Sequence, residues 1–161
     1  MGGEIVHSGE IEVALANYLN PRMNLIVPNI SWGLDLYEID LLVLTQSQYA
    51  WEIEIKTSLS DLKADNNKKH GHYSNKIKRL YFAVPEELQE EALKHIPERA
   101  GLFIVSESMH VRLIKAPKLN MRARKFNAEE INHLYKLAAM RLWSLKERIY
   151  RLQKKLTPNH P

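Results

Sequence analysis

Residues 38–56 read EIDLLVLTQSQYAWEIEIK, and this stretch decides the fold. Two apolar runs, residues 41–45 and 51–55, flank the short polar turn TQSQ. Runs of this length, rich in Leu, Val and Ile and separated by a turn, are typical of a β-hairpin. We therefore expect a hairpin at the centre of a sheet.

Four charged residues lie on this hairpin in an unusual arrangement. Side chains alternate between the two faces of a strand, so Glu52, Glu54 and Lys56 share one face. Asp40 opens the partner strand. Burying such charges as ordinary core would be costly, because each loses its hydration. A metal site gives the cluster a chemical reason.

The residue types suit a hard divalent cation. Mg²⁺ and Mn²⁺ prefer oxygen ligands, which the carboxylates of Asp40 and Glu54 and the backbone carbonyl of Ile55 would supply. Lys56 could orient or help deprotonate an attacking water and offset phosphate charge. A surface hairpin whose Glu and Lys side chains merely pair with each other would carry the same pattern, and the motif alone does not separate the two.

The rest of the chain predicts helices and strands in mixed order. Helices are expected over residues 8–20, 58–65, 86–95 and 128–156, and further strands over 25–28, 80–84, 101–106 and 110–115. Asn127 is the expected N-cap of the last helix. This order indicates an α/β protein with a mixed sheet flanked by helices. We divide it into a core, residues 1–127, and a basic C-terminal helix and tail, residues 128–161, packed on the same domain.

Charge is distributed unevenly over the 161 residues. Residues 1–111 hold 10 Lys and Arg against 16 Asp and Glu, a balance of −6, and residues 112–161 hold 13 against 3, a balance of +10, which together give the net +4. A basic C-terminal third suits a polyanion such as DNA, although a solvated helix face would look alike. The absence of cysteine, of a signal-like N-terminus and of a long apolar run leads us to expect a cytoplasmic protein without a membrane partner.

The spacing of the hairpin acids resembles the PD-(D/E)xK nuclease superfamily. Asp40, Glu54 and Lys56 match its motif as D-x13-E-x-K, with Ile39 where the name of the superfamily has Pro. The resemblance implies a restriction-endonuclease-like fold and a Mg²⁺- or Mn²⁺-dependent deoxyribonuclease, an endonuclease rather than an exonuclease. It also implies an assisting acid on the first helix, which is Glu10 or Glu12, and Glu10 is taken as the candidate.

A closer resemblance covers residues 38–115. The segments EIEIKTSLSDLKAD, KKHGHYSNKIKRLYFAVPEEL and IPERAGLFIV are similar to MmcB-type DNA-repair proteins and related phage proteins. The matching positions are Lys56, Ser58, Asp61, Asp65, Lys69, Tyr73 and residues 82–85. The chain departs from that pattern at residues 66–72, where KKHGH replaces a Lys-Trp pair. This likeness implies a role in DNA repair or phage DNA metabolism.

Several basic and aromatic residues are candidates for DNA binding. They lie after the motif strand and in the segment before the last helix, residues 116–127, which we call the connector: Lys68, Lys69, Tyr73, Arg122, Arg124 and Lys125. No base-reading motif accompanies them, so contacts to the DNA backbone are expected. A zinc site at His70 and His72 is an alternative that lacks further ligands.

Two rival functions remain open. The chain could be a DNA-binding accessory protein that keeps the nuclease fold without cleaving, or the long helix could pair with a second copy as a homodimer. The heptad spacing of that helix slips near residues 138–142, which weakens a continuous coiled coil.

Overall fold

A computed structural model describes residues 6–31, 33–65 and 73–156. Its strands are β1 (Leu25–Ile30), β2 (Ile39–Leu44), β3 (Ala50–Ile55), β4 (Ile77–Pro85), β5 (Gly101–Val105) and β6 (Val111–Lys115). Its helices are α1 (Ser8–Tyr18), α2 (Leu59–Asp65), the 3-10 turn η1 (Glu86–Leu88), α3 (Gln89–His95) and α4 (Ala128–Leu156).

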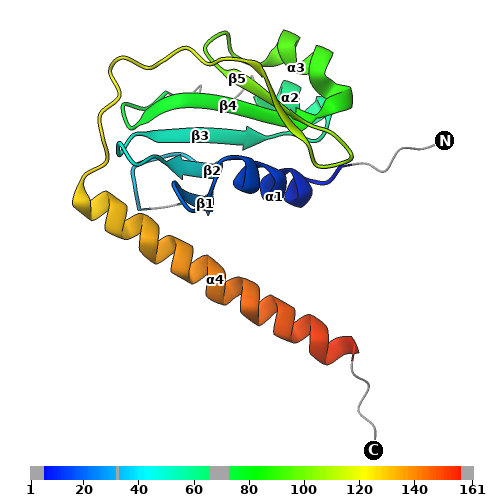
Figure 1. The fold of residues 1–161 in the computed structure, drawn as a ribbon, viewed down its shortest axis with the longest axis vertical. Coiled ribbons are helices and arrows are strands. Elements are labelled where there is room, and N and C mark those ends of the chain that lie inside the picture. Colours follow the sequence, from blue (N-terminus) through cyan, green and yellow to red (C-terminus); the bar gives the residue numbers. More distant parts are fainter. Residues whose placement is uncertain (1–5, 32, 66–72, 157–161) are drawn as a thin grey trace, which may run out of the picture.

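The six strands form one sheet in sequence order (Figure 1). The pairs β1–β2, β2–β3 and β5–β6 are antiparallel, and β3–β4 and β4–β5 are parallel. The predicted mixed α/β sheet with flanking helices and a long C-terminal helix is therefore confirmed. The central hairpin is also present, with each strand beginning one or two residues earlier than the apolar runs suggest. Its turn is closed by a 3.0 Å hydrogen bond from the Thr45 amide to the Tyr49 carbonyl.

One face of the sheet is covered by α1. Ile11 and Leu15 of this helix pack in a buried cluster with Leu41, Ile53 and Phe103. Each of these strand residues belongs to the set that alternation places on the same side. The helix begins where the sequence predicts, with His7 at the N-cap position.

The opposite face carries two separate apolar clusters. Under β1 and β2, Leu134 and Leu137 of α4 pack with Val27 and Leu42. Under β4 and β5, the helices α2 and α3 cover a cluster that includes Leu62, Ala92, Phe82, Leu102 and Ile104. The middle strand β3 lies between the two clusters in the sheet, and on this face it carries buried Ala50, Glu52 and Glu54.

The helix α4 has two unlike halves. Its start is fixed by a capping box, in which the Glu130 amide donates to Asn127 Oδ1 at 2.8 Å and the Asn127 amide donates to Glu130 Oε2 at 2.9 Å. Its first half packs against the sheet, and its C-terminal half extends away from it (Figure 1). Within the described residues no helix is both long and apolar enough to cross a membrane.

Candidate active site

The sequence-predicted acids meet at the ends of β2 and β3. The antiparallel register pairs Leu41 with Ile53, which brings Asp40 beside Glu54 in the neighbouring strand. The Asp40 carboxylate accepts a 2.8 Å hydrogen bond from the backbone amide of Ile55. Asp40 is thus tied to the peptide unit that links Glu54 to Ile55, and the two motif strands are joined at the site.

Lys56 lies between two buried carboxylates. Its Nζ is 2.9 Å from Glu54 Oε2 and 3.1 Å from Asp65 Oδ1, the latter at the end of α2. The side chains of Glu54 and Asp65 are only 2% and 4% exposed, and that of Lys56 is 12% exposed. The lysine is therefore held in a nearly dry ion triad rather than extended into solvent.

This environment fixes the protonation state of Lys56. Burial alone would lower the pKa of the ammonium, but the charges and hydrogen bonds of Glu54 and Asp65 outweigh it and raise the pKa. Lys56 stays protonated at any physiological pH in this arrangement. It can orient a water or offset phosphate charge, and it is a poor base.

Two further acids are buried at this site. Asp65, which the sequence offers only as a position of the family pattern, is the second partner of Lys56. Glu52 is buried at 5% exposure on the same face of β3 as Glu54. The position of Asp65 at the end of a short helix directly after the motif strand is the sequence feature that could have indicated its role. For Glu52, strand alternation predicts the face of the sheet but not the burial.

The two acids of α1 have different surroundings. Glu10 Oε2 accepts a 2.7 Å hydrogen bond from the His7 amide and so caps its own helix. Glu12 is partly buried, and this burial, together with the charge of Asp40, raises the pKa of its carboxyl. The charge of Asp40 therefore acts on Glu12 of α1.

Glu12 also lines a groove of about 720 Å³ between α1, β1 and α4. The α4 wall of this groove includes Arg141 and Arg148. Arg141 donates a hydrogen bond to the Asn29 carbonyl of β1 at 2.5 Å. The groove therefore connects an acid near Asp40 with cations of the C-terminal helix.

The donor set fits a divalent cation incompletely. Across residues 6–31, 33–65 and 73–156, no three or more His, Asp and Glu side chains come together as a metal-binding group. Asp40 and Glu54 contribute two carboxylates from adjacent strands, and Ile55 a nearby carbonyl. One oxygen of Glu54 is engaged by Lys56. A hard ion bound here would share Glu54 with Lys56 and depend on water for further ligands.

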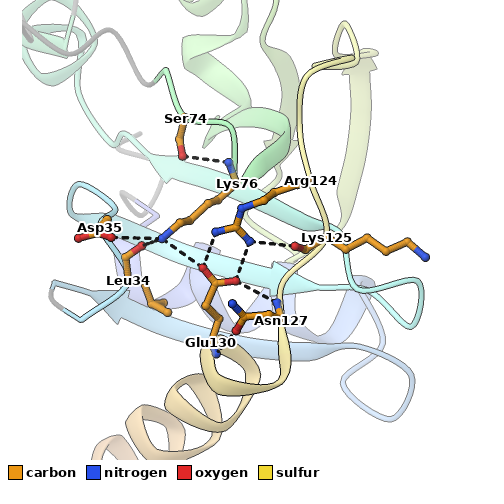
Figure 2. Close-up of polar contacts among 8 residues, drawn as sticks. All are labelled: Leu34, Asp35, Ser74, Lys76, Arg124, Lys125, Asn127 and Glu130. Atoms are coloured by element: carbon orange, nitrogen blue, oxygen red, sulfur yellow. Dashed lines mark hydrogen bonds and ion pairs between the residues drawn. The ribbon is translucent and has the colours of Figure 1, made fainter.

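The DNA-binding candidates of the connector are dispersed. Figure 2 shows the Arg124 guanidinium turned onto Glu130, with two hydrogen bonds of 2.8 and 2.7 Å. Lys125 Nζ lies 5.8 Å from the ring centre of Tyr49, and Arg122 is exposed. Tyr73 is exposed beside the guanidinium of Arg99. Lys68 and Lys69, with His70 and His72, lie outside the described residues.

Sequence reasoning missed the anchor that holds Arg124. The Lys76 side chain is buried and lies 3.2 Å from Glu130 Oε1, while its ammonium also contacts the Leu34 carbonyl (Figure 2). The pKa of Glu130 is lowered to about 2, mainly because Arg124 donates hydrogen bonds to its carboxylate. Burial opposes this effect in part, and further hydrogen bonds from the Asn127 amide and Lys76 add to it. No sequence pattern links residues 76 and 130, because their contact depends on how the connector runs across the sheet.

Comparisons with known proteins agree with this fold. A solved structure of a protein of unknown function from Silicibacter pomeroyi is similar over 97% of both chains, with 21% identity and a TM-score of 0.60. No curated protein matches the sequence. A family model described as "MmcB-like: DNA repair protein MmcB-like" matches residues 35–148, which span the hairpin, strands β2 to β6 of the sheet and most of α4. The chain therefore belongs to the MmcB-like family.

Proposed function

We propose that this protein is a metal-dependent deoxyribonuclease of the PD-(D/E)xK type, acting in DNA repair or phage DNA metabolism. The observation that carries the proposal is the meeting of Asp40, Glu54 and Lys56 at one end of the β2–β3 hairpin, through the Asp40–Ile55 and Lys56–Glu54 hydrogen bonds. Membership in a family described by a DNA repair protein supports the DNA substrate.

Each motif residue would have its own task. Asp40, Glu54 and the carbonyl of Ile55 would hold Mg²⁺ or Mn²⁺. When bound, the ion would lower the pKa of a water ligand and stabilise the charge that develops on the phosphate. Lys56, which stays protonated, would position that water and offset phosphate charge. Glu12 is the preferred assisting acid, because Glu10 is committed to capping α1.

The groove beside Glu12 supplies a route for the DNA backbone. Arg141 and Arg148 face it from α4, and cations of this kind bind phosphates without reading sequence. A backbone held by its phosphates along such a surface groove needs no free terminus, which favours endonucleolytic cutting.

A cleavage assay tests the proposal. Purified protein is incubated with single-stranded, duplex, nicked and branched DNA, with Mn²⁺ or with EDTA, beside Asp40→Asn. Asp61→Asn is the matched control, since Asp61 is an exposed acid of α2. We expect cleavage that needs the ion, is lost in Asp40→Asn and is kept in Asp61→Asn. Absence of cleavage on every substrate, with DNA binding intact, would contradict a nuclease.

One observation favours a second candidate, a DNA-binding accessory protein that does not cleave. The Glu54–Lys56–Asp65 triad is held together by its own ion pairs, and buried ion triads of this kind can be purely structural. In that case DNA binding would be unchanged by EDTA and by Asp40→Asn. The same set of reactions, read by band shift instead of cleavage, separates the two candidates.

A further inference from the structure

A small pocket with an aromatic and basic lining lies at the start of β4. It has a volume of about 140 Å³, and its walls include Tyr73, Lys78, Leu80, Arg99 and Lys118. The pocket is distinct from the groove beside Glu12, which is formed by α1, β1 and α4. None of the roles proposed for the motif residues uses it.

Tyr73 presents its ring at the mouth of this pocket. The side chain is 73% exposed, so most of its ring surface is open to a ligand. The guanidinium carbon of Arg99 lies 4.2 Å from the ring centre, in cation–π contact. The stacked pair forms a platform: the guanidinium covers one face of the ring, and a nucleobase would stack on the other face.

Cations continue from this platform along the surface. Lys78 lines the pocket and its Nζ lies 5.1 Å from the ring centre of Tyr49, and Lys125 approaches the same ring at 5.8 Å. Lys118 is exposed and forms an ion pair with Glu98, which is also exposed, and a phosphate could take the place of the Glu98 carboxylate. We call these residues the basic–aromatic strip: Tyr73, Arg99, Lys118, Lys78, Tyr49 and Lys125.

The backbone beneath the strip is held firmly. The side-chain amide of Asn120 donates to the carbonyls of Ser74 and Ile77 at 2.9 and 3.0 Å. The backbone amide of Asn120 donates to the Lys78 carbonyl at 3.0 Å. The Lys118 amide donates to the Arg99 carbonyl at 2.9 Å. The connector is thus fixed to both neighbouring segments, so the strip needs little ordering on binding, which favours affinity.

The strip lies on the same face of the sheet as the motif acids. Leu80 lines the pocket, belongs to the apolar cluster under β4 and β5, and pairs with Glu52 of β3 in the parallel register. Glu54 comes after Glu52 on that face, about 7 Å further at roughly 3.3 Å per residue. The pocket and the two carboxylates of β3 therefore belong to the same face of the sheet.

We propose that the basic–aromatic strip binds unpaired nucleotides of single-stranded DNA, with a base stacked on the face of the Tyr73 ring opposite Arg99 and phosphates held by Lys78 and Lys118. Bases in a duplex are stacked on each other and cannot reach an aromatic platform, whereas unpaired bases can. This inference rests on the proposed DNA function and adds the class of substrate: DNA with a single-stranded segment.

Binding without cleavage provides the test. Fluorescence anisotropy is measured in EDTA with a labelled single-stranded oligonucleotide and with a duplex of the same sequence. We expect Tyr73→Ala to weaken single-strand binding about tenfold, in line with the loss of one stacked base, and Tyr73→Phe to retain it. Tyr135→Ala is the matched control, because Tyr135 is a comparably exposed tyrosine on α4, and it should bind as the unmodified protein does.

The lysines should show a different signature. Lys118→Ala is expected to reduce the slope of log affinity against log salt by about 0.7, the loss of one phosphate contact on a single strand. Tyr73→Ala should leave that slope unchanged, because stacking releases no counterions. This contrast distinguishes a stacking platform from a general basic surface.

Two outcomes would overturn the inference. One is single-strand binding by Tyr73→Ala equal to that of Tyr135→Ala, and the other is an equal loss of duplex and single-strand binding. Neither depends on cleavage, since all measurements are made in EDTA. If the protein does not cut DNA but Tyr73→Ala weakens single-strand binding, the nuclease proposal fails and the proposal for the strip stands. If the protein cuts DNA and Tyr73→Ala has no effect on binding, the proposal for the strip fails and the nuclease proposal stands.

Discussion

Lys56 Nζ lies 2.9 Å from the Oε2 of Glu54, two residues before it in the chain, and both side chains are nearly closed to water. Residues two apart in a strand share a face, so this contact follows from the strand itself. The third member, Asp65, comes from α2 and makes the pair a triad. The charges of the triad, one positive and two negative, bear on stability and on any chemistry at the site.

Replacing Lys56 by Met should destabilise the protein as well as abolish cleavage. The variant keeps the volume of the side chain but leaves Glu54 and Asp65 buried without their cation, which is expected to cost about 3 kcal/mol in the free energy of unfolding. Urea unfolding measures this. Lys63→Met is the control on α2, where the side chain is exposed. Equal unfolding curves for the two variants would show that the triad contributes nothing.

The pH dependence of the Lys56 contribution has a definite sign. Its pKa in the folded protein lies above the unfolded value, so its stabilisation is fully present below about 10.5 and is lost only as the pH rises through the folded pKa. The stability difference between the protein and Lys56→Met should therefore be constant between pH 6 and 9. A stability difference that decreases as the pH rises from 6 to 9 would mean that Lys56 loses its proton in this range.

Glu12 and Glu10 should differ in their effect on metal binding. The raised pKa of Glu12 means that protons compete with a cation near Asp40, so Mn²⁺ affinity should increase as the pH rises above 4.5, the usual carboxyl value. Glu12→Gln should flatten this dependence. Glu10→Gln should leave it in place and cost about 1 kcal/mol of stability through loss of the helix cap. Isothermal titration with Mn²⁺ at several pH values measures the first effect. A pH dependence that is flattened by Glu10→Gln and kept in Glu12→Gln would contradict this assignment.

The anchor around Glu130 predicts an acid-sensitive attachment of α4. The folded pKa of Glu130, about 2, lies below the unfolded value near 4.5, so its contribution is fully present above 4.5 and disappears as the pH falls toward 2. Glu130→Gln should lower the free energy of unfolding by about 2 kcal/mol at pH 7, because Lys76 loses a buried partner. The difference should vanish near pH 2. Glu129→Gln, an exposed neighbour, is the control.

The projecting half of α4 predicts self-association with an unusual salt dependence. Leu142, Leu145, Ile149, Leu152 and Leu156 have 3–4 spacing and are 46 to 81% exposed. Lysines and arginines flank this seam, so two copies would repel each other. We expect a homodimer whose population increases with salt, while DNA binding decreases with salt.

Light scattering at 0.1 and 0.5 M salt tests the homodimer. Ile149→Lys places a charge in the seam and should abolish association. Tyr150→Lys is the matched control, since Tyr150 is exposed one position off the seam. A chain that stays monomeric at both salt concentrations would exclude this role for α4.

Local patterns predicted much of the fold. The alternation in residues 51–55 gave the β3 strand, the periodicity from residue 128 gave α4 and its Asn127 cap, and Pro85 marked the end of the β4 apolar run. These features depend on neighbours in sequence, so single-sequence reasoning reaches them. The strand ends were less accurate, since β4 begins at Ile77 through contacts with β3 and the connector.

The site was only partly within reach of the sequence. The face shared by Glu54 and Lys56 follows from alternation, but the contact of Lys56 with Asp65 depends on where α2 packs. Arg124 is a second example: its charge suggests DNA contact, and the structure adds that its guanidinium is hydrogen-bonded to Glu130. Charge counts locate cations along a chain and do not tell which of them already have a partner.

The packing of Leu134 and Leu137 against Val27 and Leu42 has a practical consequence for shortening the chain. Cutting after residue 127 would strip an apolar layer from the sheet edge and expose those side chains to water, so the remaining fragment should aggregate. Cutting after Ala138 would spare that layer but would remove Arg141 and Arg148, and with them the α4 wall of the groove. The two cuts therefore separate what α4 contributes to folding from what it contributes to the groove.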